Sequence, residues 1–147
     1  MFVLALGAAA LSGALMAVQG TLNAGLSKTI GLLEAAFVVH VVGAAVGGVL
    51  LLAGLGQGGL KQAPQATWYT YIGGLLGMAI VFLVALAIGK AGAASATTAI
   101  IVGQISTAVV IDLFGWLGVE QVPFSIYKVL GVVLLAGGAW LLLYRPT

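Results

Sequence analysis

Two carboxamides lie one helical turn apart in a stretch that is otherwise free of ionisable groups. Residues 1–26 contain no Asp, Glu, Lys, Arg or His, yet they include Gln19 and Asn23. A spacing of four residues places both side chains on one face of an α-helix. A carboxamide donates and accepts hydrogen bonds and stays neutral at every physiological pH. The pair therefore predicts either a ligand bound through hydrogen bonds or hydrogen bonds between helices.

Further polar residues follow the same helical spacing in other apolar segments. In hydrocarbon such groups must face protein or water, and ionisable ones are functional candidates. The alternative for each is interhelical hydrogen bonding, worth below about 1–2 kcal/mol per contact. Asp112 is turned about 80° from Gln104 by the helical step of about 100°. Ser12 extends the first stripe, a second face holds Thr97, Gln104 and Thr107, and His40 precedes the small residues Gly43, Ala44 and Gly47.

Composition identifies the solvent around these residues. Of the 147 residues, 63% are hydrophobic and 5% are charged, whereas soluble domains carry about 25% charged residues. Apolar runs of about 20 residues recur along the chain, which indicates an integral membrane protein. The absence of cysteine excludes disulfides, thiolate metal sites and a Cys nucleophile. The net charge of +2 is spread over five separated basic residues, so the sequence predicts no nucleic-acid patch.

Charges, prolines and glycine-rich breaks predict an all-α protein with five transmembrane helices in a single domain, 1–147. The first segment lacks the basic start of a signal peptide and its apolar run is longer, so we expect a retained helix. Trp68 and Tyr71 belong to an aromatic cluster at one interface, and Trp116 is expected at the far interface of the fourth helix. Lys128 is expected to extend towards the headgroups. The expected helices are approximately 2–26, 34–55, 68–89, 94–117 and 124–144.

Two GxxxG spacings occur in these helices, Gly43/Gly47 and Gly73/Gly77. Such spacings let helix backbones approach closely. Ordinary helix packing is the simplest interpretation, and the motif alone indicates nothing about transport.

Basic residues are almost evenly divided between the two membrane sides. If the chain begins on side A, then Lys61 and Lys128 lie on A, whereas Lys28, Lys90 and Arg145 lie on B. So small a difference gives almost no orientation by the positive-inside rule. We therefore expect insertion in both orientations and pairing as an inverted dimer, the two-chain form of an inverted repeat. The odd number of helices supports this, and a weakly biased protein with one orientation is the alternative.

In an inverted dimer, ionisable residues that are far apart within one chain would lie at the same depth in the membrane as residues of the other chain. Glu34 and His40 are expected toward side B and Asp112 toward side A. In an antiparallel dimer, Asp112 of one chain therefore reaches the depth of Glu34 and His40 of the other. We take these three as candidate coupling residues. Asp112 lies about one turn inside the Trp116 interface, where a proton-coupled cycle could use it; capping the helix or bonding a neighbouring helix is its structural alternative.

Two motifs resemble those of a known family. Gln19-Gly-Thr-Leu-Asn23-Ala-Gly-Leu26 resembles the first-helix QxxxNxxL pattern of the YdcZ-like half-size family in the drug/metabolite transporter (DMT) superfamily. Gly103-Gln104 through Ile111-Asp112-Leu-Phe-Gly115 is similar to its helix-four signature. Trp68 with Gly73-Gly74, and Lys128-Val-Leu-Gly131, also agree with the family. His40 departs from the apolar or small residue expected there.

The resemblance implies one half of a ten-helix transporter of the bacterial cytoplasmic (inner) membrane, completed by antiparallel dimerisation with a second copy or a close homologue. We expect a secondary transporter of a small organic metabolite or drug-like solute that works by alternating access. The predicted cavity residues are Gln19, Asn23, Gln104, Thr107, Trp68 and Tyr71.

Other classes of function are less compatible with the sequence. It contains no nucleotide-binding loop. One His and three scattered carboxylates do not form a metal-ligand set, and His40 has no neighbouring nucleophile, so we expect no cofactor, no metal and no enzyme activity. The remaining alternatives are a non-transporting membrane subunit that scaffolds or regulates a partner, and one half of a heterodimeric transporter.

Overall fold

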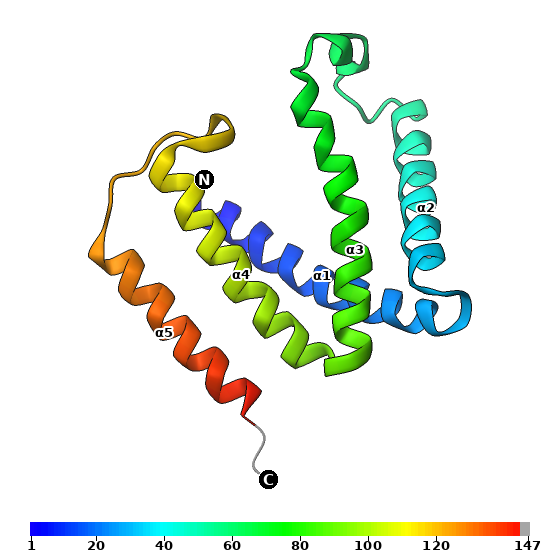
Figure 1. The fold of residues 1–147 in the computed structure, drawn as a ribbon. Coiled ribbons are helices and arrows are strands. Elements are labelled where there is room, and N and C mark those ends of the chain that lie inside the picture. The colour runs from blue at the N-terminus through cyan, green and yellow to red at the C-terminus, as the bar shows by residue number, and fades with distance from the viewer. Residues whose placement is uncertain (145–147) are drawn as a thin grey trace. The chain divides into compact units, whose positions relative to one another are not determined.

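All regular structure in the computed structural model, which describes residues 1–144, is helical (Figure 1). Five α-helices are each long and apolar enough to cross a membrane, which confirms the predicted fold class at this level. Three short 3₁₀ helices lie in the connections. The bounds are α1 (Phe2–Ile30), α2 (Leu32–Leu52), η1 (Gly59–Gln65), η2 (Trp68–Tyr71), α3 (Ile72–Ala91), α4 (Ala93–Phe114), η3 (Trp116–Gly118) and α5 (Ile126–Leu143).

The chain forms two compact units, one from Met1 to Lys90 and one from Ala91 onward. The first holds α1, α2 and nearly all of α3, and the second holds α4 and α5. Within the first unit, α1 passes the end at which α2 begins and α3 finishes (Figure 1). Within the second, α4 and α5 run side by side and a long connection joins them (Figure 1).

The turn between α1 and α2 is shorter than expected. The sequence predicted that α1 would end at Leu26, but it continues through Lys28 to Ile30. The chain reverses at Gly31 alone, whose φ of 97° and ψ of 158° lie in a region that is essentially restricted to glycine. Lys28 therefore lies in the last turn of α1 and Glu34 in the first turn of α2, where each charge is favourable to its helix dipole.

The connection between α4 and α5 is longer than expected. The sequence predicted helix as far as Leu117, but α4 ends at Phe114 because Gly115 adopts the left-handed conformation with φ of 62°. Pro123 follows, and α5 begins at Ile126 rather than Phe124, after an extended Ser125. Proline favours an extended conformation in the residue before it, so the chain stays non-helical here.

Small side chains make up most of the buried core of the first unit. Gly20 is buried on α1, and a Cβ added to it would lie 2.7 Å from Cδ1 of Ile88 and 2.8 Å from Cγ1 of Val84, both on α3. A larger side chain at this position would force Ile88 and Val84 to move. This is the packing mode of membrane helices, where small residues allow close approach. The buried residues are Gly20, Asn23 and Ala24 on α1, Ala35 and Ala36 on α2, and Ala85 and Ile88 on α3.

The predicted GxxxG pairs do not pack in this way. Nothing lies within 4 Å of a Cβ added at Gly43, Gly47 or Gly73. Gly77 alone has a neighbour, His40, whose Nε2 would be 3.4 Å from the added Cβ. Among these glycines, Gly20 therefore has the nearest side-chain neighbours on another helix.

Candidate functional site

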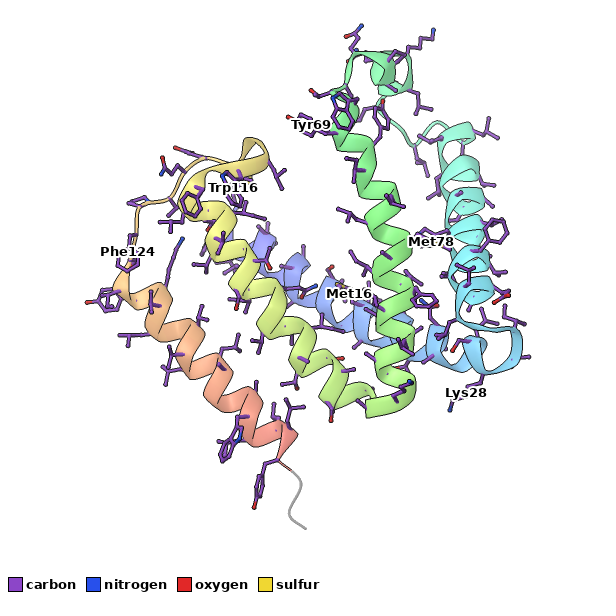
Figure 2. The ribbon with its side chains drawn as sticks, in the orientation of Figure 1. Met16, Lys28, Tyr69, Met78, Trp116 and Phe124 are labelled. Atoms are coloured by element: carbon purple, nitrogen blue, oxygen red, sulfur yellow. The ribbon has the colours of Figure 1, made fainter. Side chains whose placement is uncertain are left out.

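The polar stripe predicted on α1 borders a shallow, wide-open hollow. Ser12, Gln19 and Asn23 all border one hollow of about 470 Å³. Its other lining residues are apolar, and Met16 among them is labelled on α1 in Figure 2. The structure thus brings three predicted polar residues to one surface near the middle of the longest helix. The full lining is Ser12, Leu15, Met16, Val18, Gln19, Leu22 and Asn23.

Asn23 is the buried polar residue of this hollow. It is only 5% exposed, although it lines the open surface. Within residues 1–144 its carboxamide makes no hydrogen bond, yet neither of its polar atoms is sealed from the surface. Leaving a carboxamide unpaired in an apolar setting costs about 1–3 kcal/mol. Asn23 is therefore poised to bond whatever enters the hollow.

Ser12 and Gln19 differ from Asn23 in burial. Both are exposed in the chain, and neither makes a side-chain hydrogen bond within the described part. Neighbouring Thr21 is already satisfied, because its hydroxyl donates to the carbonyl of Ala17 at 2.9 Å. The hollow therefore presents two carboxamides and one hydroxyl whose bonding capacity is unused.

His40 and Glu34 make local interactions in the first unit. Nδ1 of His40 lies 2.7 Å from the carbonyl oxygen of Ala36, so this nitrogen carries a proton and donates it. Nε2 then faces Gly77 on α3. The carboxylate of Glu34 folds back over Gly31 at the start of α2. Neither residue lines the α1 hollow.

Asp112 forms an ion pair that the sequence analysis did not identify. Nζ of Lys128 on α5 donates to Oδ2 of Asp112 on α4 at 3.2 Å, and the two side chains are 35% and 37% exposed. Lys128 was expected only to extend towards the headgroups, whereas it neutralises the carboxylate. The sequence contained a signal: the two opposite charges lie in the last turn of α4 and the first turn of α5, on either side of one connection.

The connection folds back to support this pair. The side-chain amide of Gln121 donates to the carbonyl of Leu113 at 2.9 Å, and the backbone N–H of Val122 donates to the carbonyl of Asp112 at 2.9 Å. These bonds satisfy carbonyl groups that the end of α4 would otherwise leave unpaired. Figure 2 labels Trp116 and Phe124, which begin and end this segment. The structural alternative for Asp112, bonding to a neighbouring helix, is thus present in the fold.

The other four predicted cavity residues are not among the residues that line the α1 hollow. Gln104 and Thr107 are exposed on α4, in the second unit. Trp68 is 75% exposed and Tyr71 is 57% exposed, and the hydroxyl of Tyr71 donates to the carbonyl of Ala63 in η1. Trp68 packs edge-on against Tyr69, which Figure 2 labels at the start of this region. Neither aromatic residue lines the α1 hollow.

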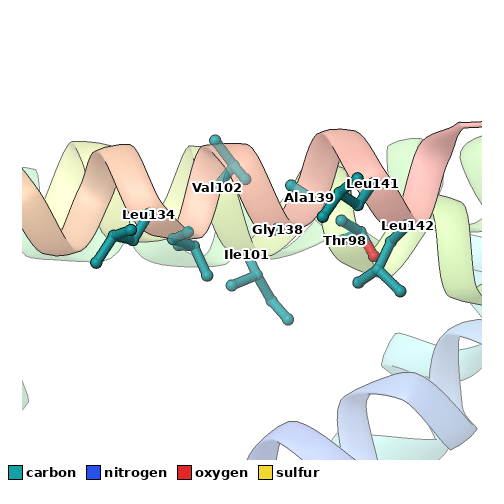
Figure 3. A pocket seen from close by; sticks show the side chains of 9 residues that line it. Thr98, Ile101, Val102, Leu134, Gly138, Ala139, Leu141 and Leu142 are labelled. Atoms are coloured by element: carbon teal, nitrogen blue, oxygen red, sulfur yellow. The ribbon is translucent and has the colours of Figure 1, made fainter.

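A second, almost entirely apolar hollow of about 500 Å³ lies between α4 and α5 (Figure 3). Thr98 is its one residue with a polar side chain, and the hydroxyl of Thr98 is satisfied by the carbonyl of Ala94 at 2.8 Å. This surface therefore has no unused hydrogen-bonding group with which to orient a polar solute. Among residues 1–144 there is also no group of His, Asp and Glu that could hold a metal ion.

Five spanning helices with a polar hollow on one of them define a multi-pass membrane protein. The family described as "Putative inner membrane exporter, YdcZ" matches residues 4–141, so the chain belongs to this family and the resemblance seen in the motifs is confirmed. The chain is a multi-pass protein of the cytoplasmic membrane in a family of transporters, not of enzymes. No curated protein and no solved structure matches the chain.

Proposed function

We propose that the protein is a secondary transporter of a small organic solute, which it binds in the α1 hollow and moves by alternating access. The observation that supports this is Asn23, which is buried, has no hydrogen-bond partner among residues 1–144 and borders the hollow beside Gln19. A polar group inside a membrane marks a substrate pathway when no neighbouring helix satisfies it. The membership of an exporter family agrees with outward transport.

A second copy in inverted orientation completes the transporter in this proposal. Gln104 and Thr107 are exposed on an apolar helix, and in a bilayer such groups must face protein or water. One chain supplies five helices, and a partner chain would supply the other five helices and the other side of the transport pathway. In an inverted dimer, Glu34 and His40 of one protomer share a depth with Asp112 of its partner, which makes the two end states equivalent.

Asp112 is the candidate coupling group of this cycle. Lys128 from α5 faces it, and the neutral Gln121 of the connection bonds the carbonyl of the next residue, Leu113. Binding of a proton by Asp112 would cancel the ion pair and release the contact between the two helices. The same event would therefore change both charge and helix packing, which is what a coupled conformational step requires.

Export can be tested without knowing the substrate. Cells that express the wild type and the Asn23→Leu variant are compared by mass spectrometry of the solutes in the medium. We expect at least one solute to be exported at least about tenfold less by Asn23→Leu, since tenfold corresponds to about 1.4 kcal/mol, near one hydrogen bond. Leucine replaces an unpaired amide with an apolar group of similar size, so expression should not fall.

Thr21→Val is the matched control, because the hydroxyl it removes is already bonded within α1. This variant should export like the wild type. The solute found in this way is then tested in proteoliposomes that contain this protein alone. If transport requires a homologous chain, the protein is one half of a heterodimer. If the medium contains the same solutes at the same levels for all strains, the protein is a non-transporting subunit.

A further inference from the structure

We propose that the α1 hollow binds an uncharged, hydrogen-bonding part of the substrate, so that the protein transports neutral polar organic solutes rather than cations or anions. This inference rests on the proposed transport function and adds the substrate class to it. It depends on two independent features, the unpaired Asn23 in the hollow and the internal ion pair between Asp112 and Lys128.

The polar side chains of the hollow determine which ligand groups it can bind. Asn23 is 5% exposed and lines the hollow, and its carboxamide has no hydrogen-bond partner within residues 1–144, so it offers both donors and an acceptor to an occupant. Gln19 offers the same pair of functions and Ser12 adds a hydroxyl. Two carboxamides and a hydroxyl match amide, hydroxyl or carbonyl groups of a ligand. Leu15, Val18 and Leu22 supply apolar contact for the rest of it.

The hollow itself carries no charged side chain. No residue that lines it is ionisable, and residues 1–26 contain no ionisable side chain. A bound ion would therefore have no counter-ion among residues 1–26; the one charged side chain of α1, Lys28, lies in its last turn. An unpaired charge near the middle of a bilayer is strongly disfavoured.

A carboxylate outside the hollow could neutralise the charge of a bound cation. The sequence contains three acidic residues, Glu34, Asp112 and Glu120. Asp112 is already paired with Lys128. Glu34 lies at the start of α2 with its carboxylate over Gly31, and Glu120 lies in a connection between helices. No unpaired carboxylate therefore lies within the central part of a spanning helix.

A basic side chain outside the hollow could likewise neutralise the charge of a bound anion. Lys128 is neutralised by Asp112, and Lys28, Lys61 and Lys90 lie at helix ends or in a connection. His40 donates Nδ1–H to Ala36 and directs Nε2 to Gly77, away from the hollow. The α1 hollow thus offers hydrogen bonds from side chains that cannot carry a charge.

The charge preference can be measured directly, because the chain contains no cysteine. The Gln19→Cys variant in proteoliposomes is treated with methanethiosulfonates of similar size that carry a neutral hydroxyethyl, a cationic trimethylammonioethyl or an anionic sulfonatoethyl group. Gln57→Cys, in the exposed connection after α2, gives the reference rates. Ser12→Cys is a second hollow position, which keeps the test decisive if one variant fails to fold.

We expect the neutral reagent to modify both hollow variants, and both charged reagents to react about a hundredfold more slowly relative to Gln57→Cys. Equal relative rates for the neutral reagent and either charged one would overturn the proposal. Failure of all three reagents at both positions would also overturn it, since the hollow would then be closed to solutes. Solute export by the wild type is measured separately, so loss of this inference is distinguishable from loss of the transport function.

Discussion

At the scale of single residues, the ion pair between Asp112 and Lys128 changes the interpretation of both. A carboxylate in the last turn of an apolar helix suggested a proton-binding group by itself, and a lysine at a helix start suggested a headgroup contact. Their separation of 3.2 Å makes each the counter-ion of the other. With about a third of each side chain exposed, the pair contributes no more than about 1 kcal/mol in water.

Reversal of the two charges tests the pair. The variants Asp112→Lys and Lys128→Asp each place like charges together, so we expect each to lower the free energy of unfolding by about 1 kcal/mol. The double variant, Asp112→Lys with Lys128→Asp, should recover most of that loss. Thermal melting of the purified protein in detergent measures all three.

Transport by the double variant separates structure from coupling. If Asp112 also carries the coupled proton, the double variant should melt like the wild type but lose its response to a pH gradient. A double variant that is as unstable as the sum of the single ones would contradict the ion pair as a stabilising contact.

At the scale of helices, glycine has distinct roles along α1. Gly31 provides a backbone conformation that other residues rarely adopt, and so ends the helix. Gly20 provides space for Ile88 and Val84 of α3. Gly13 does neither, because nothing lies within 4 Å of a Cβ added there. Position in the fold, not residue type, decides what each glycine contributes.

Two alanine substitutions separate packing from helix propensity. Gly13→Ala should raise the free energy of unfolding by up to about 1 kcal/mol, because alanine favours helix and the space is open. Gly20→Ala has the same propensity gain but forces its Cβ against Val84, whose χ1 is restricted, and against Ile88. We expect it to be about 1–3 kcal/mol less stable than Gly13→Ala, as overpacked cores are. Thermal melting measures the difference, and equal melting temperatures would show that α3 does not pack on Gly20.

At the scale of the whole molecule, charge governs orientation. Two basic residues are expected on side A and three on side B, and the structure shows that one on A, Lys128, is held by Asp112. Much of the helix surface of one chain is exposed, and in a membrane it would contact lipid or a partner chain. An inverted dimer would cover the polar part while using one sequence for both orientations.

Labelling of single cysteines on opposite sides tests this arrangement. Gln57→Cys marks the connection after α2, and Thr29→Cys marks the last turn of α1, next to the turn that leads to α2. With an impermeant maleimide on intact cells, we expect about half of each variant to be labelled, since a near-even charge distribution gives no single orientation. Permeabilised cells give the total. Complete labelling of one variant and none of the other would exclude the inverted homodimer.

The sequence by itself determined the membrane environment and the five helices. The reason is that long apolar runs are sufficient for spanning helices, whose backbone hydrogen bonds are satisfied within each segment. It also predicted that Gln19 and Asn23 share a face, because helical spacing is a local property. The bounds at Ile30 and Phe114 were not predicted, since they depend on the backbone of Gly31 and Gly115.

Only the tertiary structure decided which residues meet across helices. The contact of Asp112 with Lys128 depends on how the connection folds back through Gln121 and Val122, and that path is not encoded by helical period. The choice of Gly20 over the GxxxG glycines for close packing likewise depends on where α3 crosses α1. Burial of Asn23 without a partner is a property of the assembled helices, because a side chain's unused hydrogen bonds become visible only when its neighbours are in place.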